Sequence, residues 1–445
     1  MKFAIKSKRV LIKDELTKAT LLIENGKISE ISDYNTKSDC QTEDFGNSVI
    51  MPGLTDTHVH INEPGRTEWE GFETATKAVA AGGITTLIDM PLNSSPVTTT
   101  RDSFETKAES TKNKLYIDVG FYGGLIPDNI SELESLIQRG VFGLKAFMID
   151  YGIDEFPFVN ETDIRRAFDV LKDHRNIPVL FHAEIFSEII KPDNYSEYSF
   201  KSFLETRPKE WENKAIELLI KLCREYRQRI HIVHLVSSDA VEMIRDAKSE
   251  GLPLTVETCP HYLYFSSEEI PDDDTRFKCT PPIRENINRE KIWDALKEGV
   301  IDFIVSDHSP CDLELKFIKE KNFEKAWGGV SSLQFSLPVF WTAAMQRGSS
   351  IIDVSKLMSR NTADFIGFGN SKGRIQKGFD ADIIVFDPDK NFKVEEKNIL
   401  HKHKVTPYSE KVLIGVVETT FLKGEKVFEN GKIVSEPNGQ LIFWK

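Results

Sequence analysis

Two histidines that are separated by a single residue are the first candidates for chemistry in this sequence. His58 and His60 lie in GLTDTHVHI, a segment whose apolar residues favour a β-strand. Alternate residues of a strand project from the same face, so the two imidazoles could bind one metal ion, with Asp56 in line with them. An isolated pair of this kind is more often an ordinary core or surface pair. The row of polar residues at the end of an apolar strand is what favours a metal site.

Other polar side chains end other apolar segments. His182 closes PVLFHAE, His234 falls in IHIVHLVS, and Asp307 follows FIVS in IDFIVSDHSP. A buried imidazole without a partner costs about 1–3 kcal/mol, so each histidine either bonds to the core or binds a ligand. Four histidines at equivalent strand ends favour a shared metal site. Asp307 could bind a metal and accept a proton, as hydrolysis requires, although capping the turn that follows is its alternative role.

A lysine lies inside a segment that is otherwise apolar. Lys145 belongs to FGLKAFMI, where an ammonium group would be poorly solvated, and lysine is almost never fully buried without a partner. An ion pair inside the fold is one explanation. The other is that desolvation beside metal ions favours the neutral amine, which can add carbon dioxide and become a carbamate. The carbamate has two oxygens and a negative charge, so Lys145 could then bridge two metal ions.

A repeated pattern of strands and helices must position these residues. Eight apolar segments are separated, in most cases, by segments with helical periodicity such as FETATKAVAAG and ENKAIELLIKLCREYRQ. The predicted strands cover residues 53–61, 85–90, 116–124, 142–149, 178–184, 229–237, 253–260 and 301–310. This alternation predicts an α/β protein with a (β/α)8 TIM barrel, in which functional residues gather at the carboxyl ends of the strands. An open, doubly wound sheet is the competing fold.

The two ends of the chain have a different pattern. Residues 1–50 and the residues after about 370 contain short strands separated by glycine turns, without helices. Because chain termini often lie close together, we expect both ends to build one small β-sandwich domain from residues 1–50 and 370–445. The barrel domain is then expected to cover residues 51–369.

The composition is that of an ordinary globular protein. The 445 residues are 40% hydrophobic, and 57 Lys and Arg against 70 Asp and Glu give a net charge of −13. This balance offers no basic surface for nucleic acid or membranes, and no apolar stretch approaches the roughly 18 residues of a membrane span. Five scattered cysteines without a CxxC motif argue against disulfides, and the N-terminal residues lack a signal-peptide core. We therefore expect a cytoplasmic protein.

Several motifs, in order along the chain, resemble the cyclic amidohydrolases of the amidohydrolase superfamily. They include GLTDTHVHINEPGRTEWEGF, GLKAFMI, ETCPHYL, DFIVSDHSPC and KGRIQKGFDADIIVFDP, and the resemblance covers about residues 5–435. It implies a (β/α)8 barrel with a binuclear metal site and a small β-sandwich made from both termini. It also implies two divalent metal ions, Zn2+ first with Co2+ or Mn2+ as alternatives, and carbon dioxide for the carboxylation of Lys145.

The resemblance also implies a role for each candidate residue. His58 and His60 would bind one metal, His182 and His234 the other, carboxylated Lys145 (N6-carboxylysine) would bridge them, and Asp307 would be both a metal ligand and the catalytic acid/base. Two divalent ions with a hydroxide, a carbamate and a carboxylate leave a modest positive charge, which suits an oxyanion in the transition state. The implied reaction is attack of hydroxide on a cyclic amide, with Asp307 carrying the proton to the leaving nitrogen.

Within the superfamily the motifs are most similar to the allantoinase family, which implies hydrolysis of the hydantoin ring of allantoin to allantoate in purine breakdown. Dihydroorotases, one alternative, usually place an arginine two residues after the second histidine to hold the substrate carboxylate, whereas this sequence has Asn62. We predict that Asn62 and Asn93 bind the substrate, although a turn explains Asn93 equally well. Hydantoinases and dihydropyrimidinases, a second alternative, usually carry a tyrosine five residues after the bridging lysine. Here that position is Asp150 and Tyr151 follows, so the oxyanion donor stays unidentified.

A non-catalytic interaction protein on the same fold is a third alternative, which the retention of all six ligands disfavours. The resemblance implies a homotetramer with a small-molecule substrate and without nucleic acid or membrane partners. The charged segment 311–327 could be a mobile lid, although a solvated loop is the favoured interpretation.

Overall fold

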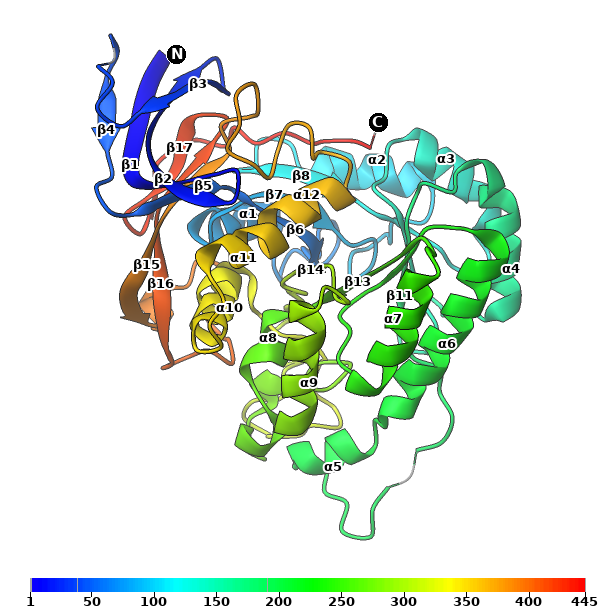
Figure 1. The fold of residues 1–445 in the computed structure, drawn as a ribbon. Helices are drawn as coiled ribbons and strands as arrows, with labels where there is room; N and C mark the ends of the chain where they lie inside the picture. Colours follow the sequence, from blue (N-terminus) through cyan, green and yellow to red (C-terminus); the bar gives the residue numbers. More distant parts are fainter. Residues whose placement is uncertain (1, 38, 190, 445) are drawn as a thin grey trace.

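The computed structural model describes residues 2–37, 39–189 and 191–444, which form a barrel with surrounding helices beside a strand-rich layer (Figure 1). The barrel strands are β6 (Leu54–Val59), β7 (Ile84–Asp89), β8 (Asp118–Phe121), β9 (Gly123–Gly124), β10 (Leu144–Phe147), β11 (Val179–His182), β12 (Ile230–Ile232), β13 (Leu254–Thr258) and β14 (Phe303–Ile304). Each of the eight predicted segments overlaps at least one of them. Most of the observed strands are shorter than predicted because the carboxyl ends of the segments leave the sheet as loops. The predicted strand 116–124 is split in two at Tyr122, whose backbone N–H donates to the carbonyl of Asp89.

The barrel strands are parallel and form a closed ring. One run has the order β6-β7-β8 and the other β14-β13-β12-β11-β10-β9. A backbone hydrogen bond from the N–H of Phe142, just before β10, to the carbonyl of Phe121 in β8 connects the two runs at one side. A parallel bridge between Val59 and His308 connects them at the other. The predicted (β/α)8 barrel is therefore confirmed, and the open sheet is excluded.

The strands are buried on both faces, as expected for a parallel sheet covered by helices. In β11, Val179 and Phe181 pack in a cluster with the surrounding helices, whereas Leu180 packs in a separate cluster inside the barrel. Side chains alternate along a strand, so His182 points inward like Leu180. Lys145 is in register with Leu180 on the neighbouring strand and shares that inward direction.

Helices cover the outside of the barrel (Figure 1). They are α1 (Phe72–Ala81), α2 (Arg101–Ser110), α3 (Leu133–Gln138), α4 (Glu161–Val170), α5 (Phe200–Glu205), α6 (Lys209–Tyr226), α7 (Val241–Ser249), α8 (Pro260–Tyr264), α9 (Asn286–Lys297), α10 (Ser336–Met345), α11 (Ile351–Ser355) and α12 (Asn361–Phe365). Single turns are η1 (Ile130–Glu132), η2 (Leu171–Asp173), η3 (Ser238–Ala240), η4 (Ser267–Glu269), η5 (Thr275–Phe277), η6 (Leu333–Phe335), the π-helical η7 (Lys356–Arg360) and η8 (Glu396–Asn398). Helix α6 buries Ala215, Leu219 and Leu222 at helical spacing, which explains its amphipathic sequence. No helix within the described ranges is long and apolar enough to cross a membrane.

Both ends of the chain contribute to one antiparallel-rich sheet. Its strands are β1 (Lys2–Ile12), β2 (Glu15–Glu24), β3 (Lys27–Asp33), β4 (Thr42–Asp44), β5 (Val49–Pro52), β15 (Ile383–Lys393), β16 (Val412–Leu422), β17 (Glu425–Glu429) and β18 (Lys432–Ile433). The order is β18-β17-β16-β15-β5-β1-β2-β3, with β4 beside β1. Pairing of Met51 in β5 with Ile384 in β15 joins the two ends, which lie side by side as blue and orange-red strands in Figure 1. The predicted β domain from both termini is confirmed.

Candidate metal and substrate site

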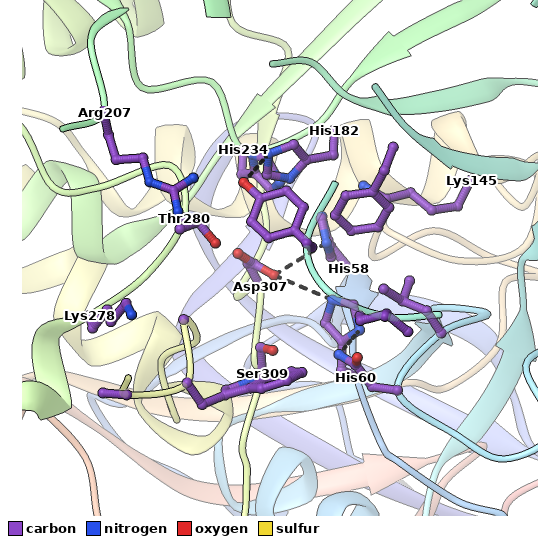
Figure 2. A pocket seen from close by; sticks show the side chains of 18 of the residues that line it. His58, His60, Lys145, His182, Arg207, His234, Lys278, Thr280, Asp307 and Ser309 are labelled. Atoms are coloured by element: carbon purple, nitrogen blue, oxygen red, sulfur yellow. Dashed lines mark hydrogen bonds and ion pairs between the residues drawn. The ribbon is translucent and has the colours of Figure 1, made fainter. Parts of the chain in front are cut away.

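A cavity of about 300 Å³ opens at the carboxyl ends of the barrel strands. It is lined by all six predicted metal ligands, His58, His60, Lys145, His182, His234 and Asp307 (Figure 2). These residues come from five strand ends that are far apart in the sequence, and the closure of the barrel brings them together.

The first group of ligands consists of His58, His60 and Asp307. One nitrogen of each ring and one carboxylate oxygen lie within 4.8 Å of one another. Asp307 Oδ1 is 3.2 Å from His58 Nε2 and 3.7 Å from His60 Nε2. Asp307 has a φ of 45°, so the chain turns sharply after β14 and directs the carboxylate to the histidines. The backbone N–H of His60 donates to the carbonyl of His308 at 2.8 Å, which ties the two segments together.

A buried glutamate fixes the ring of His58 from the opposite side. His58 Nδ1 lies 2.5 Å from Glu257 Oε1, and His231 Nε2 is 3.0 Å from the other oxygen of Glu257. When Nδ1–H donates to Glu257, the lone pair of His58 Nε2 faces the cavity, as a metal ligand requires. Burial raises the pKa of Glu257, while Lys145 acts in the opposite direction. The sequence analysis did not single out Glu257, although the carboxylate that begins ETCPHYL, within a largely apolar strand, was a usable signal.

The second group of ligands lies across the cavity. The rings of His182 and His234 are 4.5 Å apart between centroids, and that of His234 is 5.5 Å from His58. His182 Nε2 is 2.7 Å from Glu184 Oε2 and 2.6 Å from the hydroxyl of Tyr151. Tyr151 therefore reaches the cavity although it is six residues after Lys145, because the chain has already left strand β10 there. The spacing between Lys145 and Tyr151 along the sequence did not predict that this hydroxyl reaches the cavity.

Lys145 lies at the centre of β10 with 1% of its surface exposed. Its Nζ has no hydrogen-bond partner within the part of the chain that the structure describes. Burial lowers the pKa of Lys145 to about 7, although Asp307 and Glu257 act in the opposite direction. A permanent ion pair, the simpler explanation for a buried lysine, is thus absent among the described residues. An unpartnered amine between two groups of ligands fits a binuclear metal site.

The two predicted substrate-binding asparagines occupy different positions. Asn93 lines the cavity, and its Nδ2 is 3.3 Å from His60 Nδ1. Asn62 is absent from the lining, and its Nδ2 donates to the carbonyl of Asn93 at 3.3 Å. Both residues have left-handed backbones, with φ of 68° for Asn62 and 62° for Asn93, so a turn role also fits them. Asn62 is therefore placed behind Asn93 and not against the cavity.

Asp56 and two further residues near Asp307 have different surroundings. The carboxylate of Asp56 accepts backbone N–H groups of His58 and Ser306, so it braces the two strand ends instead of facing the first ligand group. Cys259 and His261 form a second set of potential ligand atoms with Asp307, again within 4.8 Å. Because this set shares Asp307 with the histidine group, it offers no independent carboxylate.

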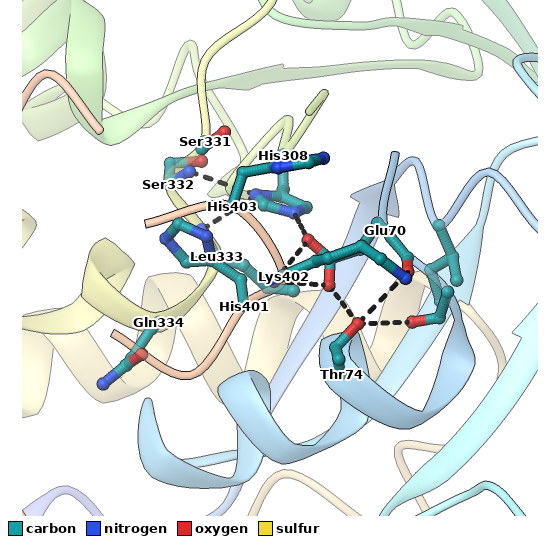
Figure 3. Close-up of polar contacts among 12 residues, drawn as sticks. Glu70, Thr74, His308, Ser331, Ser332, Leu333, Gln334, His401, Lys402 and His403 are labelled. Atoms are coloured by element: carbon teal, nitrogen blue, oxygen red, sulfur yellow. Dashed lines mark hydrogen bonds and ion pairs between the residues drawn. The ribbon is translucent and has the colours of Figure 1, made fainter. Parts of the chain in front are cut away.

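Behind Asp307, a buried carboxylate and imidazole join four segments (Figure 3). His308 Nδ1 accepts the backbone N–H groups of Ser332 at 3.1 Å and Leu333 at 3.3 Å. His308 Nε2–H therefore faces Glu70 Oε2, at 3.4 Å. Glu70 also accepts the hydroxyl of Thr74 and the backbone N–H of Lys402. Burial would raise the pKa of Glu70, but the nearby His308 imidazole, together with His401 and the hydroxyl of Thr74, outweighs burial and lowers the pKa.

The charged segment 311–327 forms one wall of the cavity. Leu313 is 46% exposed, but Lys316 is buried, and its Nζ donates to the carbonyls of Lys278, Trp327 and Gly329. Residues 324–327 line the cavity. The segment is a loop, and its second half contributes to the wall of the cavity while Glu324 and Lys325 also contact solvent.

Comparisons with known proteins agree with this architecture. The amidohydrolase family model matches residues 49–434, and the chain belongs to the amidohydrolase family. Its sequence is 43% identical to the allantoinase of Streptomyces avermitilis, covering 99% of this chain and 98% of the relative. It is 44% identical to the allantoinase of Arabidopsis thaliana, covering 98% and 90%. Among solved structures, L-hydantoinase (dihydropyrimidinase) from Arthrobacter aurescens has a TM-score of 0.92 and 30% identity, covering 99% of both chains.

Proposed function

We propose that the protein is a metal-dependent hydrolase that opens the hydantoin ring of allantoin to give allantoate. The observation that carries the proposal is the set of allantoinases that share 41–49% identity with this chain over most of its length, in several kingdoms. The hydantoinase structures with the same fold share 22–30% identity. Hydrolysis of a cyclic amide is common to both groups, and the higher identity favours allantoin as the substrate.

The donor set supports the binding of two divalent ions. We propose that His58 and His60 hold one, His182 and His234 the other, that Lys145 bridges them as N6-carboxylysine, and that Asp307 completes the first group. The unpartnered Lys145 Nζ and His234 Nδ1 fit such ligation. When bound, the ions would lower the pKa of a water molecule and polarise the amide carbonyl. Zn2+ suits imidazole and carboxylate oxygen ligands, and Co2+ and Mn2+ are compatible with them.

Asp307 is proposed to move the proton. Burial would raise its pKa, but the nearby imidazoles of His60 and His234 outweigh burial and lower it. Asp307 is then a carboxylate at neutral pH, able to take the proton of the attacking water and deliver it to the departing ring nitrogen. Tyr151 is proposed to donate its hydroxyl to the carbonyl oxygen as negative charge develops, because that hydroxyl lies within 2.6 Å of His182.

A hydantoinase or dihydropyrimidinase activity is the second candidate. The position of Tyr151 in the cavity and the TM-score of 0.92 to an L-hydantoinase favour it. Dihydroorotase activity is less favoured, since Asn62 replaces the arginine expected to hold a carboxylate. A non-catalytic interaction protein is the least favoured, because all six candidate ligands line one cavity.

We also propose the finer features that the sequence suggested. The domain boundaries are 1–50 with 370–445 for the β domain and 51–369 for the barrel. Asn93 is proposed to contact the substrate, and Asn62 is proposed to orient Asn93 through the hydrogen bond between the two residues. The protein is proposed to be a cytoplasmic homotetramer, which sedimentation velocity would test.

A substrate panel tests the proposed function. The protein, purified without chelator and supplied with Zn2+, Co2+ or Mn2+, is assayed with allantoin, hydantoin, dihydrouracil and dihydroorotate. We expect the highest kcat/KM with allantoin, and loss of turnover in Lys145→Ala and Asp307→Asn. A preference for dihydroorotate, or near-normal turnover in either variant, would contradict the proposal.

A further inference from the structure

Two basic side chains line the cavity on the wall that carries no predicted metal ligand. Arg207 lies just before α6, and Lys278 follows η5. Figure 2 shows both on the far side of Asp307 from Lys145, with the guanidinium of Arg207 directed toward Thr280. Neither residue belongs to the two groups of ligands described above.

These cations have no counter-charge within ion-pair distance among the residues that the structure describes. Lys278 is only 7% exposed, and its Nζ donates to the backbone carbonyl of Glu324 at 3.0 Å. Burial lowers the pKa of Lys278 to about 7, and the charges of Lys316 and Arg207 add to this effect. The Arg207 guanidinium packs 5.5 Å from the centre of the Trp211 ring. Keeping two such groups beside a metal site is unfavourable unless a ligand presents oxygen atoms to them.

The fixed positions of these groups point to a recognition surface. Lys316 donates to the backbone carbonyls of both Lys278 and Trp327, so it holds the two sides of this wall together. Trp327 is packed edge-on against Trp69, with ring centroids 4.9 Å apart. The wall is thereby built by a buried ammonium group and an aromatic pair, not by mobile surface side chains.

The wall offers hydrogen-bond donors to the oxygen atoms of a ligand. Arginine has five N–H donors in a planar fork, which pairs with a carboxylate and can also bind one or two carbonyl oxygens. A lysine that already donates to a backbone carbonyl and loses its proton readily is a poor counter-ion for an anion. Allantoin carries a ureido substituent on the ring, which offers a neutral carbonyl oxygen that unsubstituted hydantoin lacks.

We infer that Arg207, supported by Lys278, binds the carbonyl oxygen of the ureido substituent and so selects allantoin over unsubstituted hydantoin. This inference rests on the proposed function. It assigns the preference for allantoin to a wall that is separate from the metal ligands. A mutation in this wall should therefore change the preference between allantoin and hydantoin without abolishing ring hydrolysis.

A comparison of two substrates in one variant tests the inference. Arg207→Met keeps a long apolar side chain but removes the donors, Arg207→Lys restores a charge, and Arg166→Met on α4, with 60% of the side chain exposed, is the control. We expect Arg207→Met to lower kcat/KM for allantoin at least tenfold, equivalent to about 1.4 kcal/mol. For hydantoin, used as a substrate or as a competitive inhibitor, kcat/KM or Ki should change less than twofold. Arg207→Lys should recover part of the loss, and Arg166→Met should match the wild type.

The outcomes separate this inference from the proposed function. Equal losses for both compounds in Arg207→Met, or no loss for allantoin, would overturn the ureido contact while allantoin hydrolysis by the wild type stands. If the protein turns over dihydroorotate and this turnover depends on Arg207, Arg207 contacts a carboxylate, and the inferred contact with the ureido group is overturned as well. A wild-type protein inactive toward allantoin would overturn the proposed function and, with it, this inference.

Discussion

Replacing Glu70 by glutamine should destabilise the barrel through the contacts behind Asp307. Glu70 is completely buried and accepts the hydroxyl of Thr74 and the backbone N–H of Lys402 at 3.0 Å, and His308 Nε2 lies 3.4 Å from its carboxylate. Glutamine has nearly the same shape but replaces one acceptor oxygen by an NH2 donor, which leaves at least one buried donor unpaired. Loss of a hydrogen bond to a charged group costs about 1.5–3 kcal/mol. The thermal midpoint should fall by roughly 2–4 °C, because the unfolding entropy of a barrel of this size is large.

The stabilisation of the fold by Glu70 depends on pH, and the direction of the pKa shift of Glu70 gives the sign of this dependence. The pKa of Glu70 is lower in the folded protein than its ordinary value of 4.5. A carboxyl group of this kind stabilises the fold above its unfolded pKa, and that stabilisation is lost as the pH falls through the folded value. The difference in thermal midpoint between wild type and Glu70→Gln should therefore be complete at pH 7 and shrink below about pH 4.5.

Differential scanning calorimetry from pH 7 to pH 4 measures this difference. Glu73→Gln is the matched control, because Glu73 lies three residues further along the chain in the first turn of α1, its side chain is 58% exposed, and it pairs with Lys77 at the surface. Exposed pairs contribute about 0–1 kcal/mol, so the control should change little. Equal midpoints for wild type and Glu70→Gln at pH 7, or a difference that grows in acid, would refute the reasoning.

Three further predictions address the cavity and its surroundings. Tyr151→Phe should lower kcat for allantoin by about 10²–10³-fold with little change in KM. An unchanged kcat would exclude the oxyanion role of Tyr151. Tyr198→Phe, at an exposed tyrosine, is the control. Glu257→Gln should weaken metal affinity by about 10–100-fold, because His58 loses the partner that orients its ring. Competition with a chromophoric chelator measures this affinity. Equal affinities of wild type and variant would show that Glu257 does not orient His58 for metal binding. Burial lowers the pKa of His401 to about 3, so the unfolded chain binds an extra proton below pH 6.5 and the fold loses up to about 1.4 kcal/mol per pH unit. His401→Leu should therefore narrow the drop in thermal midpoint between pH 7 and pH 5, and an unchanged drop would argue against this contribution.

The barrel and the candidate ligands could be predicted because they leave local signals. Parallel strands buried on both faces produce apolar runs, and a histidine or lysine inside such a run is conspicuous. Lys145 and His182 were recognised in this way, and the register of β10 with β11 brings them to the same inward face. The residues at the strand ends could be predicted from the sequence. The length of each strand could not, because it depends on where the following loop leaves the sheet.

Other parts of the site could not be predicted because their partners are close only in space. Glu257 contacts His58 across 199 residues, and Glu70 contacts His308 between segments joined by the barrel closure. Tyr151 was discounted by counting residues from Lys145, a rule that fails once the chain leaves the strand. Arg207 and Lys278 lie in loops without periodicity. Glu184 is the exception, since it lies two residues after His182 and alternation along the chain could have suggested it.

The most direct measurement is the formation of allantoate from allantoin by the purified protein, before and after removal of metal. We predict stoichiometric conversion by the untreated protein, loss of turnover after chelation, and recovery when Zn2+, Co2+ or Mn2+ is returned with bicarbonate. If folded protein forms no allantoate under any of these metal conditions, or if chelated protein with no residual metal remains fully active, the proposed metal-dependent hydrolysis of allantoin is contradicted.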